Sequence, residues 1–340
     1  MIGTAVACPD KFRGSLTAAD AAAAMGRGLR TGGASTVIEL PLADGGEGTL
    51  DVILATRGGA RRTARVTGPL GDEVEAEWAM LGDGTAIVEM ARASGHALVD
   101  PARRDPLEAS TRGTGELIAA ALRAGATSVI VGVGGSATTD GGLAAVQALD
   151  WSFGGVPVTV ACDVTTGFTD AAVVYGPQKG ASVAQVGLLT RRLDQLAGVY
   201  RDRTGVDVTT LESAGAAGGL AGGLAAIGAH LEPGFDVVAD LVGLQEALSG
   251  AELVVTGEGK LDATSFAGKV VGGVLELAAD ADVARRGVIA GQVTDEAREE
   301  ASVLGEVTVL ALTDRVWQGG EAFARAALLV EEAALELARG

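Results

Sequence analysis

The sequence predicts an α/β protein built from two domains, one of them discontinuous. Strand-like and helix-like runs alternate near the N-terminus and again near the C-terminus, a pattern typical of a parallel sheet. Between these regions the pattern changes to short strands joined by a hairpin-like turn. The chain has 340 residues, 48% of them hydrophobic, which is enough for two cores and usually too much for one. We therefore expect residues 1–62 and 285–340 to form one domain, and residues 63–284 a different, inserted domain.

Each terminal region contributes two strands and two helices to this prediction. In the N-terminal region we expect strands at 4–8 and 35–40 and helices at 17–30 and 48–57. In the C-terminal region we expect strands at 287–290 and 306–312 and helices at 294–304 and 321–338. Because both half-sets have the same βαβα order, they predict a single domain made from the two ends of the chain.

The middle region begins with three strands that the pattern predicts to be antiparallel. These strands are expected at 63–66, 74–81 and 85–90, and Gly82-Asp83-Gly84 forms the last turn. Further along we expect strands at 128–133, 158–162 and 253–256 and helices at 115–124, 182–200 and 217–229. The uncharged stretch 213–229 is rich in glycine and a little short for a membrane span, so we expect a packed internal helix there.

Composition excludes several classes of partner. Asp and Glu number 44 against 26 Lys and Arg, which gives a net charge of -18 and a surface that repels nucleic acid and anionic membranes. Cys8 and Cys162 lie far apart in apolar sequence, so we expect neither a disulfide nor a cysteine zinc site, and a reducing, cytoplasmic location. A phosphate-bearing ligand would have to be captured locally by loops, a few cations and metal.

The stretch 131–142 reads Val-Gly-Val-Gly-Gly-Ser-Ala-Thr-Thr-Asp-Gly-Gly and follows a β-branched run. Its glycines permit positive φ and close approach of backbone N–H groups to a phosphate, and its hydroxyls add donors. Asp140 is an anion in such a loop, which makes sense if it holds a cation or accepts a proton from an attacking hydroxyl. A tight turn from strand to helix is the alternative interpretation.

Two loops near the N-terminus follow strands in the same way. Residues 9–16 supply the cations Lys11 and Arg13, and either Ser15 or Thr17 is expected to cap the next helix. Residues 42–49 combine two carboxylates with three glycines, which suits metal binding or recognition of substrate hydroxyls. A helix N-terminus that favours acidic residues would explain the second loop equally simply.

Two further polar loops follow strands in the second half of the chain. The first combines Asp163 with Lys179, which stands between glycines as a point charge suited to phosphate. The second, residues 256–265, carries Glu258, Lys260 and Asp262 directly after an apolar strand. Because the carboxyl ends of parallel strands bind ligands in open sheets, we expect these loops to lie at a site, although each also fits an ordinary turn.

Several mechanisms are excluded by the residues that the chain lacks. No Gly-x-x-x-x-Gly-Lys-Ser/Thr motif and no His-Arg-Asp signature occurs, so the chain is neither a P-loop enzyme nor a protein kinase. His96 and His230 are the only histidines and fit no triad or metal pattern, and His96 is expected to be structural or solvated. Trp78, Trp151 and Trp317 are expected to be packing residues.

Taken together, these loops resemble the bacterial glycerate kinase family, which phosphorylates D-glycerate with ATP and is unrelated to P-loop kinases. The resemblance covers nearly the whole chain and rests on seven motifs in order: 9–16, 43–49, 113–118, 134–142, 176–181, 215–219 and 256–262. It implies a discontinuous flavodoxin-like parallel-sheet domain and an inserted mixed α/β domain, with the site in the interdomain cleft. It also implies ATP, Mg²⁺ and a phosphoglycerate product, with 2-phosphoglycerate favoured.

The site residues are assigned as hypotheses in this frame. The catalytic assignments are Asp140 or Asp44 as proton acceptor and Lys179 at the phosphates. The substrate-binding assignments are Arg13, which stands where the family commonly has Lys, with Ser15, Asp44, Glu47 and Asp10. The nucleotide-binding assignments are Gly134, Gly135, Ser136, Ala137, Thr138, Glu258 and Lys260, and the metal assignments are Asp163 and Asp140.

Two other functions remain open on the sequence. The same loops would serve a kinase for another short hydroxy acid such as erythronate. A ligand-binding relative without catalysis would have lost acidic residues from the loops, whereas this chain keeps them. The partners that we expect are glycerate and ATP, with no nucleic acid and no membrane, and the protein is expected to be a monomer or a homodimer.

Overall fold

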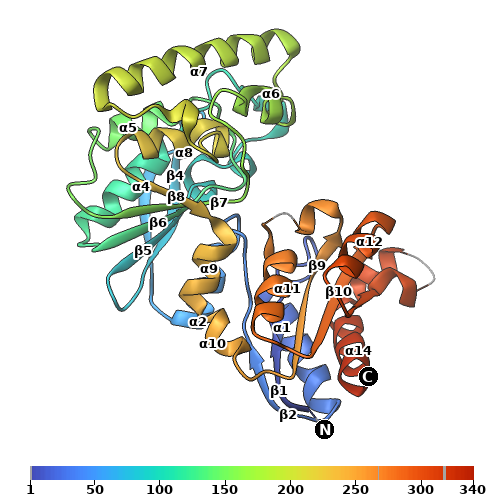
Figure 1. The fold of residues 1–340 in the computed structure, drawn as a ribbon. Helices are drawn as coiled ribbons and strands as arrows, with labels where there is room; N and C mark the ends of the chain where they lie inside the picture. The colour runs from blue at the N-terminus through green and yellow to red at the C-terminus, as the bar shows by residue number, and fades with distance from the viewer. Residues whose placement is uncertain (1, 267, 317–318) are drawn as a thin grey trace. The chain divides into compact units, whose positions relative to one another are not determined.

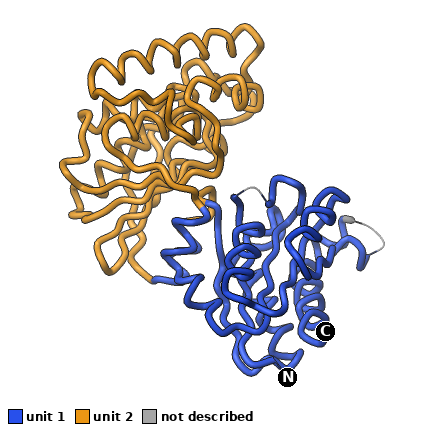
Figure 2. The backbone as a smooth tube through the Cα atoms, viewed as in Figure 1, with its two compact units in different colours: residues 1–44, 51–57, 235–340 blue, residues 45–50, 58–234 orange. Residues whose placement is uncertain are grey.

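The computed structural model describes residues 2–266, 268–316 and 319–340. The chain forms two compact units (Figure 2). Unit 1 contains Met1–Asp44, Asp51–Arg57 and Phe235–Gly340, and unit 2 contains Gly45–Leu50 and Gly58–Gly234. One unit is thus made from both ends of the chain, and the other is made almost entirely from its middle.

Unit 1 contains a parallel sheet of five strands (Figure 1). The strands are β1 (Ile2–Ala7), β2 (Ala34–Glu39), β9 (Leu253–Leu261), β10 (Arg285–Val293) and β11 (Val307–Ala311). They lie in the order β11-β10-β9-β1-β2. Counted by their succession within the unit, this is the order 2-1-3-4-5, which is that of flavodoxin-like folds. The parallel-sheet fold expected for the two chain ends is therefore confirmed.

The expected boundary at residue 285 is corrected by the structure. Residues 235–284, expected in the inserted domain, belong to unit 1. The reason is strand pairing, because β9 lies between β1 and β10, with Val254 opposite Val6 and Arg286. Because β9 completes the sheet of unit 1, it belongs to that unit. Its neighbour β1 is far from it in sequence, so the sequence pattern did not indicate this pairing.

Helices cover both faces of the unit 1 sheet. The helices of unit 1 are α1 (Ala18–Thr31), α2 (Thr49–Arg57), α9 (Gly234–Val242), α10 (Leu244–Leu248), α11 (Val270–Asp280), α12 (Asp295–Val303), α13 (Gly319–Ala324) and α14 (Ala326–Arg339). Val255 packs with Met25 of α1 and Leu329 of α14. Val254, the preceding residue, packs with Val274 of α11 in a separate cluster. Successive residues of one strand therefore face two helical layers, which explains why these strands are continuously apolar.

Unit 2 contains a mixed sheet of six strands in the order β3-β4-β5-β6-β7-β8. The strands are β3 (Ala60–Thr67), β4 (Glu73–Met80), β5 (Thr85–Glu89), β6 (Ser128–Gly132), β7 (Val158–Cys162) and β8 (His230–Pro233). The first three are antiparallel, as the hairpin pattern predicts, and β5 to β8 are parallel. β8 is a strand that the sequence analysis did not predict, since His230–Pro233 has no apolar run.

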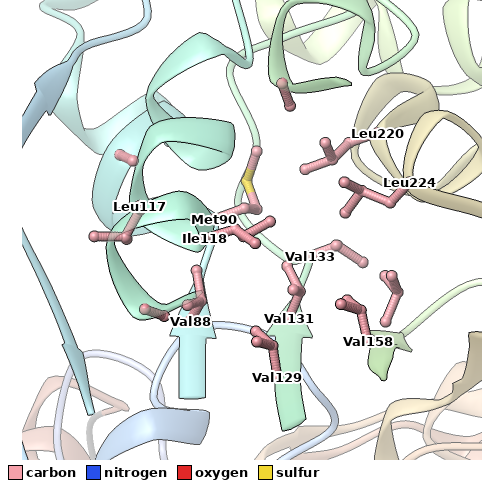
Figure 3. Packing of buried hydrophobic residues seen from close by; sticks show 14 of the residues in the cluster. Val88, Met90, Leu117, Ile118, Val129, Val131, Val133, Val158, Leu220 and Leu224 are labelled. Carbon is pink, nitrogen blue, oxygen red and sulfur yellow. The ribbon is translucent and has the colours of Figure 1, made fainter. Parts of the chain in front are cut away.

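The core of unit 2 lies between its sheet and the helices that pack on it (Figure 3). The helices of this unit are α3 (Ala91–Ser94), α4 (Arg112–Arg123), α5 (Leu143–Ala148), α6 (Ala171–Tyr175), α7 (Val183–Thr204) and α8 (Ala216–Ala226). Figure 3 shows Val131 of β6 in one core with Leu117 and Ile118 of α4 and Leu220 and Leu224 of α8. Burial of these apolar side chains stabilises the packing of the helices on the sheet through the hydrophobic effect, at about 25 cal/mol per Å² of apolar surface removed from water.

Three expectations about individual segments are refined. The stretch 213–229 does form a buried helix, but Ala217, Gly218 and Gly219 have left-handed backbone angles, so regular helix begins after them. The single helix expected at 321–338 is two helices that meet at Arg325. No helix among the described residues is long and apolar enough to span a membrane.

The aromatic and cysteine residues agree with the packing expected of them. Trp78 is buried in the unit 2 core, and Trp151 meets Tyr200 edge to face. Trp317, the third tryptophan, lies outside the described residues. Cys8 and Cys162 are both free and buried, as expected of structural cysteines.

Candidate functional site

Unit 1 has a cavity of about 420 Å³ at the carboxyl ends of its strands. The last residues of β10 and the segments that follow β1, β9 and β11 all contribute to its lining. In a sheet of order 2-1-3-4-5, the switch point lies between the first and third strands, here β1 and β9, and ligands bind there. The cavity collects six of the predicted site residues, namely Asp10, Arg13, Ser15, Asp44, Glu258 and Lys260.

The loop between β1 and α1 is anchored by Phe12. Its side chain is 1% exposed, and its backbone exchanges hydrogen bonds with Leu16, while the Ser15 N–H donates to the Phe12 carbonyl at 2.8 Å. The helix cap is Thr17, whose hydroxyl accepts from the Asp20 N–H. Since Thr17 caps the helix, Ser15 is left to line the cavity, where its hydroxyl donates to the Phe12 carbonyl at 3.1 Å.

Two carboxyl groups in this cavity have unusual pKa values. Burial raises the pKa of Asp10 to about 6, with Lys11 lowering it and Asp44 raising it. Burial also raises the pKa of Glu258 to about 7, although a hydrogen bond from Ser265 opposes the rise. Carboxyl groups that titrate near neutrality can take up a proton at physiological pH, which is the property that a general base needs.

Cations balance these acids. Lys11, Arg13, Lys260 and Lys269 all line the cavity. Lys260 is exposed and forms an ion pair with Asp262 at 3.2 Å. A cavity with both signs of charge, of which one cation is a forked guanidinium, is suited to a small hydroxy acid or a phosphate group.

The second group of predicted residues lies in unit 2, in the loop that follows β6. Lys179 is 7% exposed, and its ammonium group donates to the Ser136 hydroxyl at 2.7 Å and to the Thr138 carbonyl at 2.5 Å. Burial lowers the pKa of Lys179 to about 7, and the nearby charge of Asp140 opposes this. The structure thus brings the predicted phosphate cation to the predicted phosphate loop, whose bonded residues Ser136 and Thr138 are 43 and 41 positions away in sequence.

Asp140 is held at the end of this loop by three hydrogen bonds. Its Oδ2 atom accepts from the Thr111 N–H at 2.9 Å and the Thr111 hydroxyl at 2.8 Å, and its Oδ1 atom accepts from the Gly142 N–H at 3.2 Å. Burial raises its pKa, and these hydrogen bonds oppose the rise. The carboxylate therefore joins the start of α4 to the turn before α5, which is a structural task in addition to the predicted chemical one.

The glycines at the end of β6 and in the loop that follows it are required by close packing against the loop 44–49. A Cβ atom on Gly134 would lie 2.6 Å from Gly46 Cα, and one on Gly132 would lie 2.5 Å from the Gly45 carbonyl oxygen. No side chain fits at these distances, so the two glycine loops pack directly against each other in unit 2. Glu47 is exposed, and it does not line the cavity with the other predicted substrate residues.

Glu89 is a residue that the sequence analysis missed. It ends β5, is 1% exposed, and its Oε1 atom accepts from the N–H groups of Gly48 and Leu50, both at 2.9 Å. Its Oε2 atom accepts from Arg92 Nε at 2.9 Å. Glu89 thus fixes the end of the glycine loop and the start of α2. The only signal in the sequence is a single acid at the end of the apolar run Thr85–Glu89.

Magnesium was expected at Asp163 and Asp140. Among residues 2–266, 268–316 and 319–340, no three His, Cys, Asp or Glu side chains form a group that could hold a metal ion. Mg²⁺ does not need such a group, since it commonly binds one or two carboxylates together with waters and substrate phosphates. Asp163 is partly exposed and directly follows β7. Burial raises the pKa values of Cys162 and Tyr175, and the charge of Asp163 adds to both, so a carboxylate suited to that mode is present.

Comparison with known proteins identifies the family to which the chain is similar. The sequence profile of the glycerate kinase family matches residues 5–155 and 150–340. Glycerate 2-kinase of Escherichia coli (strain K12) is 42% identical over 327 aligned positions, covering 86% of each chain. Glycerate kinase of Halalkalibacterium halodurans is 37% identical, covering 99% of this chain and 98% of that protein.

A solved structure extends the comparison to the fold. The crystal structure of a "putative glycerate kinase 2" from Salmonella typhimurium LT2 matches with a TM-score of 0.85 and 36% identity. The match covers 99% of this chain and 98% of that one, so it includes both units. The chain therefore belongs to the glycerate kinase family.

Proposed function

We propose that this protein is a glycerate kinase that transfers the γ-phosphoryl group of ATP to a hydroxyl of D-glycerate. The observation that carries the proposal is the cavity at the switch point of unit 1, where cations and titratable carboxyl groups line one space. Membership of the glycerate kinase family supports the substrate. The similarity to a protein named glycerate 2-kinase favours 2-phosphoglycerate as the product.

In unit 1 we assign the acceptor to Arg13 and Ser15. The Arg13 guanidinium can hold the glycerate carboxylate with two parallel hydrogen bonds, and the Ser15 hydroxyl can supply a third. Asp10 and Asp44 are assigned to the hydroxyl groups of the acceptor, and Lys260 to the phosphates of the nucleotide. This arrangement orients a small substrate by its charge and its hydroxyls at once.

In unit 2 we assign the phosphates to the loop Gly134–Thr138 and Lys179. Backbone N–H groups and the buried ammonium group would stabilise the negative charge that moves during phosphoryl transfer. Asp163 is assigned to Mg²⁺, with Asp140 near the same phosphates. When bound, the metal ion neutralises charge on the phosphate oxygens.

A coupled assay of ADP release tests the proposal. D-glycerate should give a higher kcat/KM than L-glycerate or erythronate, and ³¹P and ¹³C NMR should identify the phosphorylated hydroxyl. Arg13→Ala should raise the KM for glycerate far more than that for ATP, whereas Arg27→Ala, which removes an exposed ion pair of α1, should change neither. A preference for erythronate would replace the acceptor in the proposal, and no ADP release with any acceptor would identify a ligand-binding relative.

A further inference from the structure

Glu258 stands at the carboxyl end of the central strand of unit 1. It belongs to β9, one of the two strands that flank the switch point, and it pairs in register with Ala290 of β10. Its side chain lines the cavity together with the predicted acceptor residues Arg13 and Ser15. The sequence analysis assigned Glu258 to the nucleotide, but its surroundings point to another task.

The two oxygens of the Glu258 carboxylate differ in their hydrogen bonding. A hydrogen bond from Ser265 engages the carboxylate. The Ser265 Oγ atom itself accepts from the Asp262 N–H at 3.1 Å, so its own proton is free to donate to Glu258. The Glu258 Oε1 atom is buried and has no hydrogen-bond partner among the residues that the structure describes. A buried oxygen without a hydrogen bond lowers the stability of the protein unless a ligand donates a hydrogen bond to it.

The neighbouring carboxylates are already occupied. Asp10 Oδ1 accepts from the Lys11 N–H at 2.6 Å and lies 3.8 Å from Lys11 Nζ. Asp262 accepts from the Thr264 N–H and hydroxyl through Oδ1, and from Lys260 through Oδ2. Glu258 is thus an acid of the cavity with a buried oxygen to which no described residue donates a hydrogen bond.

We propose that Glu258 accepts the proton of the acceptor hydroxyl during phosphoryl transfer. The inference rests on the proposed kinase function, with ATP as the phosphoryl donor. As the O–H bond breaks, its electron pair forms the new bond from oxygen to the γ-phosphorus. The bond from that phosphorus to the β,γ-bridging oxygen breaks, ADP leaves with the electron pair, and the proton remains on Glu258.

The electrostatic surroundings give this group a suitable pH range. The charged groups that face Glu258 are Asp10 after β1, Asp262 after β9 and Lys269 before α11. Burial has the largest effect and raises the pKa of Glu258 to about 7, while the Ser265 hydrogen bond and Lys269 lower it. The group is ionised, and able to accept a proton, only above this pH, so kcat/KM should rise with pH through about 7.

The test combines Glu258→Gln with pH profiles. The variant should lose about 10²- to 10⁴-fold in kcat, the usual contribution of a general base, and should lose the acidic limb of the profile. Affinities for glycerate and ATP, measured by calorimetry, should change little. Glu252→Gln is the matched control, because Glu252 is an exposed acid just before the same strand, and its carboxylate accepts from the Gly3 N–H at 3.0 Å.

A second variant tests whether the pKa of Glu258 sets the acidic limb of the pH profile. Ser265→Ala removes the hydrogen bond that lowers the pKa of Glu258, so the acidic limb should move to higher pH while the enzyme stays active at alkaline pH. If Glu258 and Ser265 had only a structural role, Ser265→Ala would not shift the acidic limb of the pH profile. Circular dichroism and thermal unfolding establish that each variant is folded.

The outcomes separate the inference from the function on which it rests. If the wild-type protein releases no ADP with glycerate, the proposed function fails. If the wild type is active and folded Glu258→Gln keeps its kcat and its acidic limb, Glu258 is not the proton acceptor and the kinase proposal stands. Recovery of the variant by raised Mg²⁺ would overturn the inference in favour of a metal ligand.

Discussion

Replacing Glu89 with alanine should destabilise unit 2 and release the loop that precedes α2. The Glu89 carboxylate accepts from two backbone N–H groups and from Arg92, and hydrogen bonds to charged groups contribute about 1.5–3 kcal/mol each. In Glu89→Ala the N–H of Leu50, a fully buried residue, loses its partner, and such an orphan costs about 1–3 kcal/mol. Because contributions within one network are not additive, we expect the free energy of unfolding to fall by about 3–5 kcal/mol.

Glu89→Gln separates the contribution of the two backbone N–H groups from the contribution of Arg92. Its amide oxygen can still accept from the N–H groups of Gly48 and Leu50, so the loss is chiefly the charged contact with Arg92, about 1–2 kcal/mol. Glu77→Ala is the control, because Glu77 is only partly buried and also bonds Arg92, at 3.0 Å, and we expect less than about 1 kcal/mol from it.

Two measurements check this prediction. Urea unfolding followed by circular dichroism gives the free energy, provided that the slope with denaturant is unchanged among the variants. Hydrogen exchange of the peptide 45–57 reports the local effect, since the amide of Leu50 should exchange faster in Glu89→Ala. An alanine variant within about 0.5 kcal/mol of the wild type, with unchanged exchange in that peptide, would refute the reasoning.

Three further predictions concern charge. Lys179, whose pKa is about 7, carries its charge mainly below that pH, so ATP affinity measured by calorimetry should fall as pH rises through 7, and Lys179→Met should abolish this dependence. Asp140→Asn should lower the free energy of unfolding by about 1–3 kcal/mol, because it weakens the three hydrogen bonds of this carboxylate. The same variant should lower kcat by orders of magnitude. Near-wild-type turnover in the folded variant would remove Asp140 from the mechanism. The pKa of Glu258 rises from 4.5 to about 7 on folding, so the protein loses stability as pH rises between these values, by up to about 3 kcal/mol. Glu258→Gln should therefore be more stable than the wild type at pH 8 and equal to it near pH 4, as thermal unfolding at both pH values would reveal.

The secondary structure was predictable where the local pattern was strong. The strand predicted at 158–162 is β7, with the same bounds, because five apolar or β-branched residues lie between turns. The strand predicted at 253–256 continues to Leu261, because pairing with β10 extends it through glycines and charges. A local pattern cannot show such an extension, since the partner strand supplies the hydrogen bonds.

The candidate sites were predictable in residue type but not in arrangement. Loops that combine glycine with charge marked Asp10, Arg13 and Glu258, which do line one cavity. Glu89 was missed because one acid in an apolar strand gives no pattern, and its partners are 39 and 41 positions away. The hydrogen bonds that occupy Asp140 were equally invisible, because Thr111 becomes its neighbour only through packing of α4 beside α5.

By itself, the sequence determined the alternation of strands and helices, the two-domain plan and the loops that carry charge, because hydrophobic period and glycine content act over short stretches. Only the tertiary structure decided that β9 lies between β1 and β10, which moved the boundary from 285 to 235 and created the switch point where Glu258 stands. The Thr256 hydroxyl, for example, donates to the Cys8 carbonyl across 248 positions of sequence. Such contacts depend on the order of strands in the sheet, which no local pattern specifies.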